Sequence, residues 1–330
     1  MQVNRSNPKM ENKFVQVRGF PHKKVIETIP AVKEKQLIFV TIKKRSYTQQ
    51  RGNSMKTERA DEMIVKPCVL PPSLVKYQAL IRRLSENHLV KYDVVTEYNN
   101  RMTGYLGEES VMNFHLEPIA DLNYRIYHDL RFNLGNYFFQ IDILILCAYF
   151  TLVLEVKNWA RDWHFDKVLH QTTIDINGKM ERTKNPIFQA RLQAFKLREW
   201  LKLHNVTGTP IQYLFVNSNE KSKIIIGDDN KYKWNACNSE YLLERIDQIT
   251  NDYKIELLEE KELRKINKLL LTSHTAEDPQ LLSKHNLSRN EILTGVHCPK
   301  CLFLPMTYQS GTWKCPKSNP IKNSLHRHIS

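Results

Sequence analysis

The stretch FQIDILILCAYFTLVLEVKNW, residues 139–159, constrains the fold of this chain more than any other segment. Its apolar runs are typical of buried strands, yet it carries Asp142, Glu155 and Lys157. Strands disfavour these residue types, and a buried charge is costly unless it is paired or bound to a metal. We therefore expect the three charged residues to do something other than pack.

A two-residue loop at 148–149 folds this stretch into a hairpin in which Asp142 and Glu155 stand opposite each other. The side chains of such cross-strand partners lie about 4.5–5.5 Å apart at Cβ. Because side chains alternate along a strand, Lys157 projects from the same face as Glu155. The sequence thus predicts one face that holds two acids and one base.

Two carboxylates that face each other repel unless a cation lies between them. Mg²⁺ prefers carboxylate and water oxygens and often binds substrate phosphates as well, which makes it, or Mn²⁺, the expected ion. On this interpretation Asp142 and Glu155 bind the metal, and Lys157 assists the hydrolysis of a phosphate ester. The alternative is a salt bridge between Glu155 and Lys157 on an exposed strand face, with Asp142 at a solvated strand end.

The elements around this hairpin predict an α/β core. Asn185 is expected to cap a helix that reaches residue 204, with Pro186 at its first position. The other expected elements are a helix over 73–84, a short helix beginning near Gly107, strands over 124–130, 140–147, 151–157 and 210–217, an irregular or extended stretch over 164–184, a hairpin partner for the last strand at 222–227, and charged helices over 239–271.

Several short segments resemble, in order and spacing, the nuclease-related domain (NERD) family of the restriction-endonuclease-like PD-(D/E)xK superfamily. The resemblance covers about residues 104–220 and is carried by Gly107-Glu108 on a helix, YRIYHDLRF, QIDILIL, LVLEVKNW and NPIFQARLQAF. It implies a restriction-endonuclease-like core, in which a mixed central sheet is flanked by helices. It also implies that the protein is an endo- or exonuclease that hydrolyses DNA with Mg²⁺ or Mn²⁺.

The resemblance assigns a role to each of five site residues. Glu108 would be the helix acid, Asp142 and Glu155 the metal-binding acids, Lys157 the catalytic lysine, and Gln189 the polar residue of the following helix. Glu109 follows Glu108 directly, which leaves open which of these two acids points inward. Gln140 precedes the Asp142 position where the wider superfamily often has Pro, so a catalytically silent nucleic-acid-binding module is the alternative.

The C-terminal segment has the cysteine spacing of a zinc ribbon with one ligand replaced. Cys298-x2-Cys301 is followed after 13 residues by Cys315-x2-Ser318, and serine is a poor zinc ligand. Three histidines are the candidates for a fourth ligand: His297, His326 and His328. The alternative is a decayed tail that binds no metal.

The charge is concentrated at the N-terminus, where residues 1–54 hold +9 of the formal net charge of +14. This segment is interpreted either as a disordered basic arm that contacts phosphates, or as a mis-assigned extension with Met55 as the true first residue. The remaining chain is mildly basic, which is compatible with a DNA partner.

The longest nearly uncharged run, 143–154, is too short to span a membrane, and no secretory signal is evident, so a cytoplasmic protein is expected. The expected domains are 1–54, a helical lead-in over 55–103, the nuclease-like core over 104–235, a helical extension over 236–295 and a zinc-ribbon-like tail over 296–330.

Overall fold

The computed structural model describes residues 64–119, 124–176 and 178–318. The expectations for the basic segment 1–54, and for His326 and His328 as zinc ligands, fall outside the described residues.

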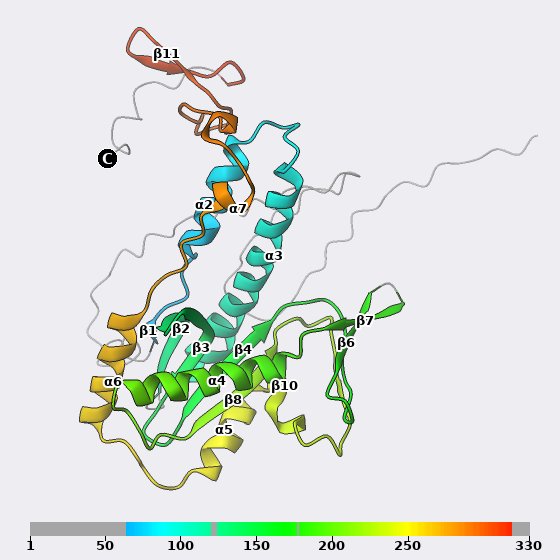
Figure 1. Ribbon diagram of the computed structural model, residues 1–330, viewed down its shortest axis with the longest axis vertical. Coiled ribbons are helices and arrows are strands. Elements are labelled where there is room, and N and C mark those ends of the chain that lie inside the picture. Colours follow the sequence, from blue (N-terminus) through cyan, green and yellow to red (C-terminus); the bar gives the residue numbers. More distant parts are fainter. Residues whose placement is uncertain (1–63, 120–123, 177, 319–330) are drawn as a thin grey trace, which may run out of the picture. The chain divides into compact units, whose positions relative to one another are not determined.

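A six-stranded mixed sheet, in the order β1-β2-β3-β4-β8-β10, forms the centre of the described structure (Figure 1). Its strands are β1 (Ile64–Lys66), β2 (Arg125–Leu134), β3 (Tyr137–Leu146), β4 (Thr151–Lys157), β8 (Ile211–Asn217) and β10 (Ala236–Asn238). Strand β3 is antiparallel to β2 and β4, whereas the β1–β2, β4–β8 and β8–β10 pairs are parallel. The expected mixed sheet flanked by helices is confirmed.

Two successive two-residue loops set the register of the three strands β2, β3 and β4. The first, at 135–136, places Gly135 at φ 65°, a left-handed conformation that glycine adopts without steric cost. At the second, 148–149, the Cys147 backbone N–H donates to the Phe150 carbonyl over 3.1 Å. The register of the β3–β4 hairpin is the one expected from the sequence.

Helices cover both faces of this sheet. On one face α4 (Pro186–Leu203) and α6 (Glu260–Ser273) pack against apolar side chains such as Leu144 and Val153, and Figure 1 shows α4 lying across the strands. The opposite face is covered by the segment Val111–Leu116 and by α5 (Leu242–Asp252). Residues 236–252, expected within a helical extension, thus supply an edge strand and a covering helix to the core.

Helix α3 (Lys91–Ser110) is 20 residues long and carries Gly107 and Glu108 in its last turns. The expectation of a short helix beginning near Gly107 was wrong, because buried side chains at helical spacing continue the pattern far upstream. These side chains are Val94, Tyr98, Met102 and Tyr105. A π-helix, Val111–Leu116, follows directly and packs into the core.

A second, four-stranded sheet, in the order β7-β6-β5-β9, forms from the stretch expected to be irregular or extended and from residues near 225. Its strands are β5 (Trp163–Phe165), β6 (Thr172–Ile176), β7 (Lys179–Thr183) and β9 (Ile224–Ile226). The expected hairpin between 210–217 and 222–227 is wrong, because β9 pairs in parallel with β5 instead. A hydrogen bond of 2.8 Å from the Trp163 backbone N–H to the Lys223 carbonyl begins this non-local pairing.

One helix begins at the capping residues that the sequence predicted. Helix α4 begins as predicted, with Pro186 in its first turn and the Asn185 side chain accepting from the Phe188 backbone N–H over 3.1 Å. The others are α2 (Pro72–Arg83) and the short α7 (Leu281–Lys284). Among the helices that the structure describes, none combines the length and the apolar character needed to cross a membrane.

Candidate active site

The candidate site lies at a fork where strands β3 and β4 separate. Their hydrogen-bonded ladder ends at the pair Ile143 and Leu154, one position before Asp142 and Glu155. Beyond the fork, Asp142 Oδ2 accepts a hydrogen bond of 2.9 Å from the Val156 backbone N–H. A side chain thus replaces the missing ladder partner, and this contact holds the Asp142 carboxylate against β4.

Glu155 and Lys157 form an ion pair on β4. Glu155 is almost fully buried, with 2 % of its surface exposed, whereas about a quarter of the Lys157 side chain is exposed. The salt bridge considered as an alternative from the sequence is therefore present, but it is not on an exposed strand face. The Lys157 side chain thus keeps an exposed part beside a buried carboxylate, where an incoming anion can approach the ion pair.

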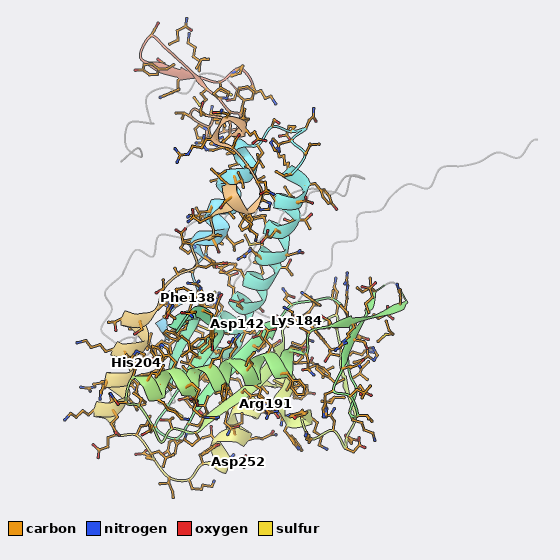
Figure 2. The ribbon with its side chains drawn as sticks, in the orientation of Figure 1. Phe138, Asp142, Lys184, Arg191, His204 and Asp252 are labelled. Atoms are coloured by element: carbon orange, nitrogen blue, oxygen red, sulfur yellow. The ribbon has the colours of Figure 1, made fainter. Side chains whose placement is uncertain are left out.

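Glu108 reaches the fork from the carboxyl-terminal end of α3. Its Oε2 atom lies 2.8 Å from Nε2 of His128, which is buried on β2. Glu109 instead accepts from the Tyr105 hydroxyl over 3.3 Å. The structure therefore selects Glu108 as the acid that faces the sheet, and Figure 2 places Asp142 close to this end of α3.

Strand β2 adds Asp129, which was not predicted as a site residue. The pairs His128–Ile143 and Leu130–Ile141 flank Asp129 and Asp142, so these two acids occupy opposite positions in the β2–β3 register. Asp129 has φ 53°, a left-handed conformation that interrupts the strand. The sequence held a signal for this position, because the turn at 135–136 places Asp129 opposite Asp142 by the same reasoning that places Glu155 there.

Two side chains support the interruption at Asp129. Lys66 Nζ donates to the carbonyl oxygens of His128 and Asp129, over 2.7 Å and 2.9 Å. The Asp129 carboxylate accepts from Gln140 Nε2 over 2.6 Å. Gln140, noted in the sequence only as a departure from the superfamily pattern, therefore has a structural partner.

Close packing at Gly107 sets the position of Glu108. A Cβ atom at residue 107 would lie 2.5 Å from Cβ of Asn158 and 2.7 Å from Oγ of Ser218. Only glycine allows the last turn of α3 to approach the ends of β4 and β8 this closely. The Asn158 amide also donates to the Thr103 carbonyl of α3 over 3.1 Å.

Burial and mutual repulsion raise the pKa values of the acids. Burial raises the pKa of Glu155 to about 8, the negative charge of Asp142 adds to the shift, and Lys157 opposes it. Burial likewise raises the pKa of Glu108, with further contributions from Asp142 and Asp129. The pKa of Asp142 is also raised by burial, although Lys157 and the Val156 N–H oppose the change. The four carboxylates therefore act on one another electrostatically.

The same carboxylates keep Lys157 charged. Burial lowers the pKa of the Lys157 ammonium group, but Glu155 and Asp142 outweigh burial, so its pKa lies above the ordinary value. Perturbed groups of both signs in one place are typical of functional sites.

Carboxylate oxygens are the ligands that a hard divalent cation prefers, and buried ionised carboxylates need a compensating positive charge. Among the described residues, the acids do not gather three or more ligand atoms at one point as the cysteines do, so the site suits a cation held by two carboxylates. Asp142 and Glu155 are the residues that would hold it. The Lys157 ammonium group already pairs with Glu155, so a cation bound by both acids would compete with it for the Glu155 carboxylate.

Gln189 is not brought into this network. It lies in the first turn of α4 and is half-buried. Among the described residues, no hydrogen bond joins its side chain to Glu108, Asp142, Glu155 or Lys157.

The three C-terminal cysteines form a separate cluster beside the hairpin of β11 (Thr307–Gln309) and β12 (Thr312–Lys314). The Sγ atoms of Cys298, Cys301 and Cys315 all lie within 4.8 Å of one another. Ser318 Oγ is 3.1 Å from Cys298 Sγ, so the serine stands beside the three thiols. The Ser318 hydroxyl is the largest contributor that lowers the pKa of Cys298, to about 6, which favours the metal-binding thiolate.

His297 is the one predicted histidine ligand that the structure describes. Its Nδ1 atom lies 3.2 Å from the Leu302 carbonyl oxygen, so this nitrogen is engaged with the backbone. The cysteine cluster thus has Ser318, rather than this Nδ1 atom, next to its thiols.

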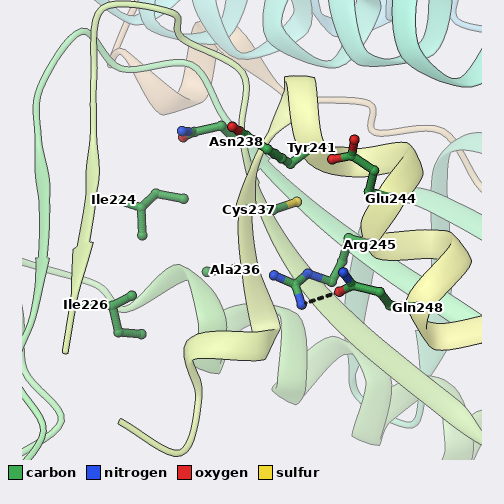
Figure 3. A pocket seen from close by; sticks show the side chains of 9 residues that line it. All are labelled: Ile224, Ile226, Ala236, Cys237, Asn238, Tyr241, Glu244, Arg245 and Gln248. Carbon is green, nitrogen blue, oxygen red and sulfur yellow. Dashed lines mark hydrogen bonds between the residues drawn. The ribbon is translucent and has the colours of Figure 1, made fainter. Parts of the chain in front are cut away.

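A pocket of about 250 Å³ lies between β9 and β10, away from the acidic fork (Figure 3). Its lining includes Cys237, Tyr241 and Arg245, and Arg245 donates to Gln248 over 2.8 Å. None of the predicted site residues lines this pocket.

Comparison with known proteins connects the fork to a family. Residues 103–218 match the family model of the nuclease-related domain. The matched segment contains all five site residues predicted in the core and ends before the cysteine cluster. No curated protein and no solved structure matches the chain.

Proposed function

Because residues 103–218 match the family model of the nuclease-related domain, we propose that this protein hydrolyses phosphodiester bonds of DNA with the help of Mg²⁺ or Mn²⁺. The observation that carries the proposal is the fork, where Asp142 and Glu155 follow the last ladder pair of β3 and β4 and Lys157 pairs with Glu155, inside the matched segment.

Each side chain has a distinct part in this proposal. Asp142 and Glu155 hold the cation, and the Val156 N–H fixes the Asp142 carboxylate. When bound, the cation would lower the pKa of a water molecule and neutralise charge on the phosphate. Lys157, partly exposed and kept charged by its neighbours, stabilises the negative charge that develops on the phosphate oxygens. Glu108, held near His128, adds negative charge on the α3 side of the fork.

A second candidate is a nucleic-acid-binding module without catalysis. The ion pair of Glu155 with Lys157 and the bond of Asp142 to Val156 favour it, because each carboxylate already has a partner. The two candidates differ in whether a cation displaces Lys157 from Glu155.

Cleavage assays separate the two candidates. Circular, linear and single-stranded DNA, and RNA, are incubated with Mg²⁺ or Mn²⁺ and the wild-type protein, Asp142→Ala or Lys157→Ala. Asp252→Ala and Lys254→Ala are the matched controls, since both residues are exposed near the end of α5 and Asp252 lies well away from Asp142 (Figure 2). Cleavage of DNA that is lost only in the fork variants supports the proposal.

Two results contradict it. Cleavage that survives both fork substitutions would reject the assigned residues, and DNA binding by the wild type with no cleavage in either metal would favour the binding module.

We also propose that Cys298, Cys301 and Cys315 hold a structural zinc ion. The proposal is supported by three thiols within 4.8 Å and by the β11–β12 hairpin next to them. A short segment with so small a core gains much of its stability from a metal. Metal analysis of the purified protein tests this, and less than stoichiometric zinc would reject it.

A further inference from the structure

An exposed tryptophan stands directly after the acidic fork. Trp159 follows Lys157 by two residues, and 40 % of its surface is exposed. Its ring stacks on Trp163, with a centroid distance of 5.3 Å and an angle of 16° between the planes. Trp163 is buried, so one face of the Trp159 ring rests on a fixed support while the residue as a whole remains open to solvent.

The support connects the tryptophan to the catalytic strand. The Trp163 ring packs edge-on against Phe215 at 5.3 Å, and Phe215 pairs with Glu155 in the β4–β8 ladder. Trp159 lies four residues beyond Glu155, so at no more than about 3.6 Å per residue their Cα atoms are within roughly 14 Å of each other. This span corresponds to a few nucleotides of a bound strand.

Basic side chains lie on the two loops next to this ring. The loops 158–162 and 218–223 lie side by side, because Asn219 donates to Asn158 and the Lys223 N–H donates to Asp162, each over 2.8 Å. Three exposed bases lie on these loops: Arg161, Lys221 and Lys223. Within the described part of the chain, none of the three forms an ion pair, although the same loops also carry the acids Asp162 and Glu220.

A second exposed tryptophan lacks this arrangement. Trp234 is 60 % exposed, but Arg245 lies over its ring at 4.9 Å and Lys233 approaches it at 5.2 Å. Protein cations already occupy this ring, which makes Trp234 a natural control.

We propose that Trp159 stacks on an unpaired base of the DNA strand, while Arg161, Lys221 and Lys223 bind its neighbouring phosphates. Aromatic rings beside basic groups bind single strands in this way, because every unpaired base has an accessible face whereas duplex bases are covered by their neighbours. The inference deepens the proposed function by naming its substrate as DNA that is single-stranded or locally unpaired near the cleaved bond. Binding at this platform does not depend on catalysis.

Fluorescence anisotropy with the full-length protein tests the platform. A labelled single-stranded oligodeoxynucleotide, its duplex and an RNA of the same sequence are titrated in buffer without added Mg²⁺ or Mn²⁺, so that no cleavage occurs and no chelator removes zinc from the cysteine cluster. Trp159→Ala is expected to weaken single-stranded DNA binding by roughly 5- to 150-fold, the loss typical of one stacked base. Trp159→Phe should retain most of the affinity, and Trp234→Ala should stay within about twofold of the wild type.

Three results would overturn the inference: unchanged single-strand binding by Trp159→Ala, an equal loss on the duplex, or tighter binding to RNA than to DNA. Thermal unfolding of each variant, with Trp159→Phe as the conservative form, separates a lost contact from a lost fold.

The proposed nuclease activity and the proposed stacking platform can be rejected independently of each other. A wild type that cleaves DNA without depending on Trp159 rejects only the platform, whereas Trp159-dependent binding without cleavage in Mg²⁺ or Mn²⁺ rejects only the nuclease.

Discussion

The carboxylate of Asp142 accepts a hydrogen bond from the backbone N–H of Val156, 2.9 Å away across the gap between β3 and β4. This contact gives Asp142 a structural task as well as a chemical one, because the N–H has lost its usual partner at the fork. The two tasks can be separated by substitution.

Asp142→Asn and Asp142→Leu should both abolish cleavage, since each removes the negative charge. Asn retains an oxygen that can accept from Val156, whereas Leu leaves that N–H unpaired. Denaturation in urea should therefore show Asp142→Leu to be less stable than Asp142→Asn by about 1–3 kcal/mol. Equal free energies of unfolding would mean that the hydrogen bond contributes nothing measurable.

Lys157→Ala should lower DNA cleavage by roughly 100- to 1,000-fold, because the developing charge on the phosphate loses a cationic partner. The same substitution should tighten Mg²⁺ or Ca²⁺ binding, since the ammonium group no longer competes for Glu155. Calorimetric titration measures the second effect without any turnover. Lys254→Ala is the control, and weaker cation binding by Lys157→Ala would contradict a shared role of Glu155.

The raised pKa of Glu155 predicts how stability without metal depends on pH. Between its ordinary value of 4.5 and about 8, the unfolded chain releases this proton while the folded protein retains it. The unfolded state then binds fewer protons, so the free energy of unfolding falls as the pH rises through this window. Denaturation at pH 5 to 8, in buffer without added Mg²⁺ or Mn²⁺, should show a shallower fall for Glu155→Gln than for the wild type. Parallel slopes would show that Glu155 titrates normally.

Two glycines of α3 offer a matched pair. Gly107→Ala forces a Cβ atom against Asn158 and Ser218 and should cost about 1–3 kcal/mol of stability, while displacing Glu108. Gly104 has no neighbour within 4 Å of such a Cβ atom, so Gly104→Ala should stabilise the helix by about 0.5–1 kcal/mol. Thermal unfolding and cleavage assays check both, and similar behaviour of the two variants would argue against close packing at Gly107.

Ser318→Cys should complete the set of four sulfur ligands. Zinc affinity, measured by competition with a chelator, is expected to rise at least tenfold, which corresponds to about 1.4 kcal/mol. Ser318→Ala is the control and should bring no gain. If Ser318→Cys leaves the zinc affinity unchanged, the fourth ligand lies elsewhere.

The features that the sequence determined by itself are set by residues that lie close together along the chain. The loop at 148–149 fixed Asp142 opposite Glu155, because a two-residue turn admits one register and side chains alternate along each strand. Asn185 and Pro186 likewise set the start of α4 through contacts within one turn. The spacing of Cys298, Cys301 and Cys315 predicted the cluster that the structure contains.

The tertiary structure alone decided which distant segments complete the site. The approach of Glu108 to His128 depends on the close contact of α3 with β4 at Gly107, and neither partner is encoded near the other. Parallel pairings such as β4–β8, β8–β10 and β5–β9 join strands through long connections, so no turn sets their register. For that reason the sequence alone predicted Asp142 and Glu155. The surface that contains the Trp159 ring forms only in the folded protein, because Trp159 stacks on Trp163 and the Trp163 backbone pairs with the chain at Lys223.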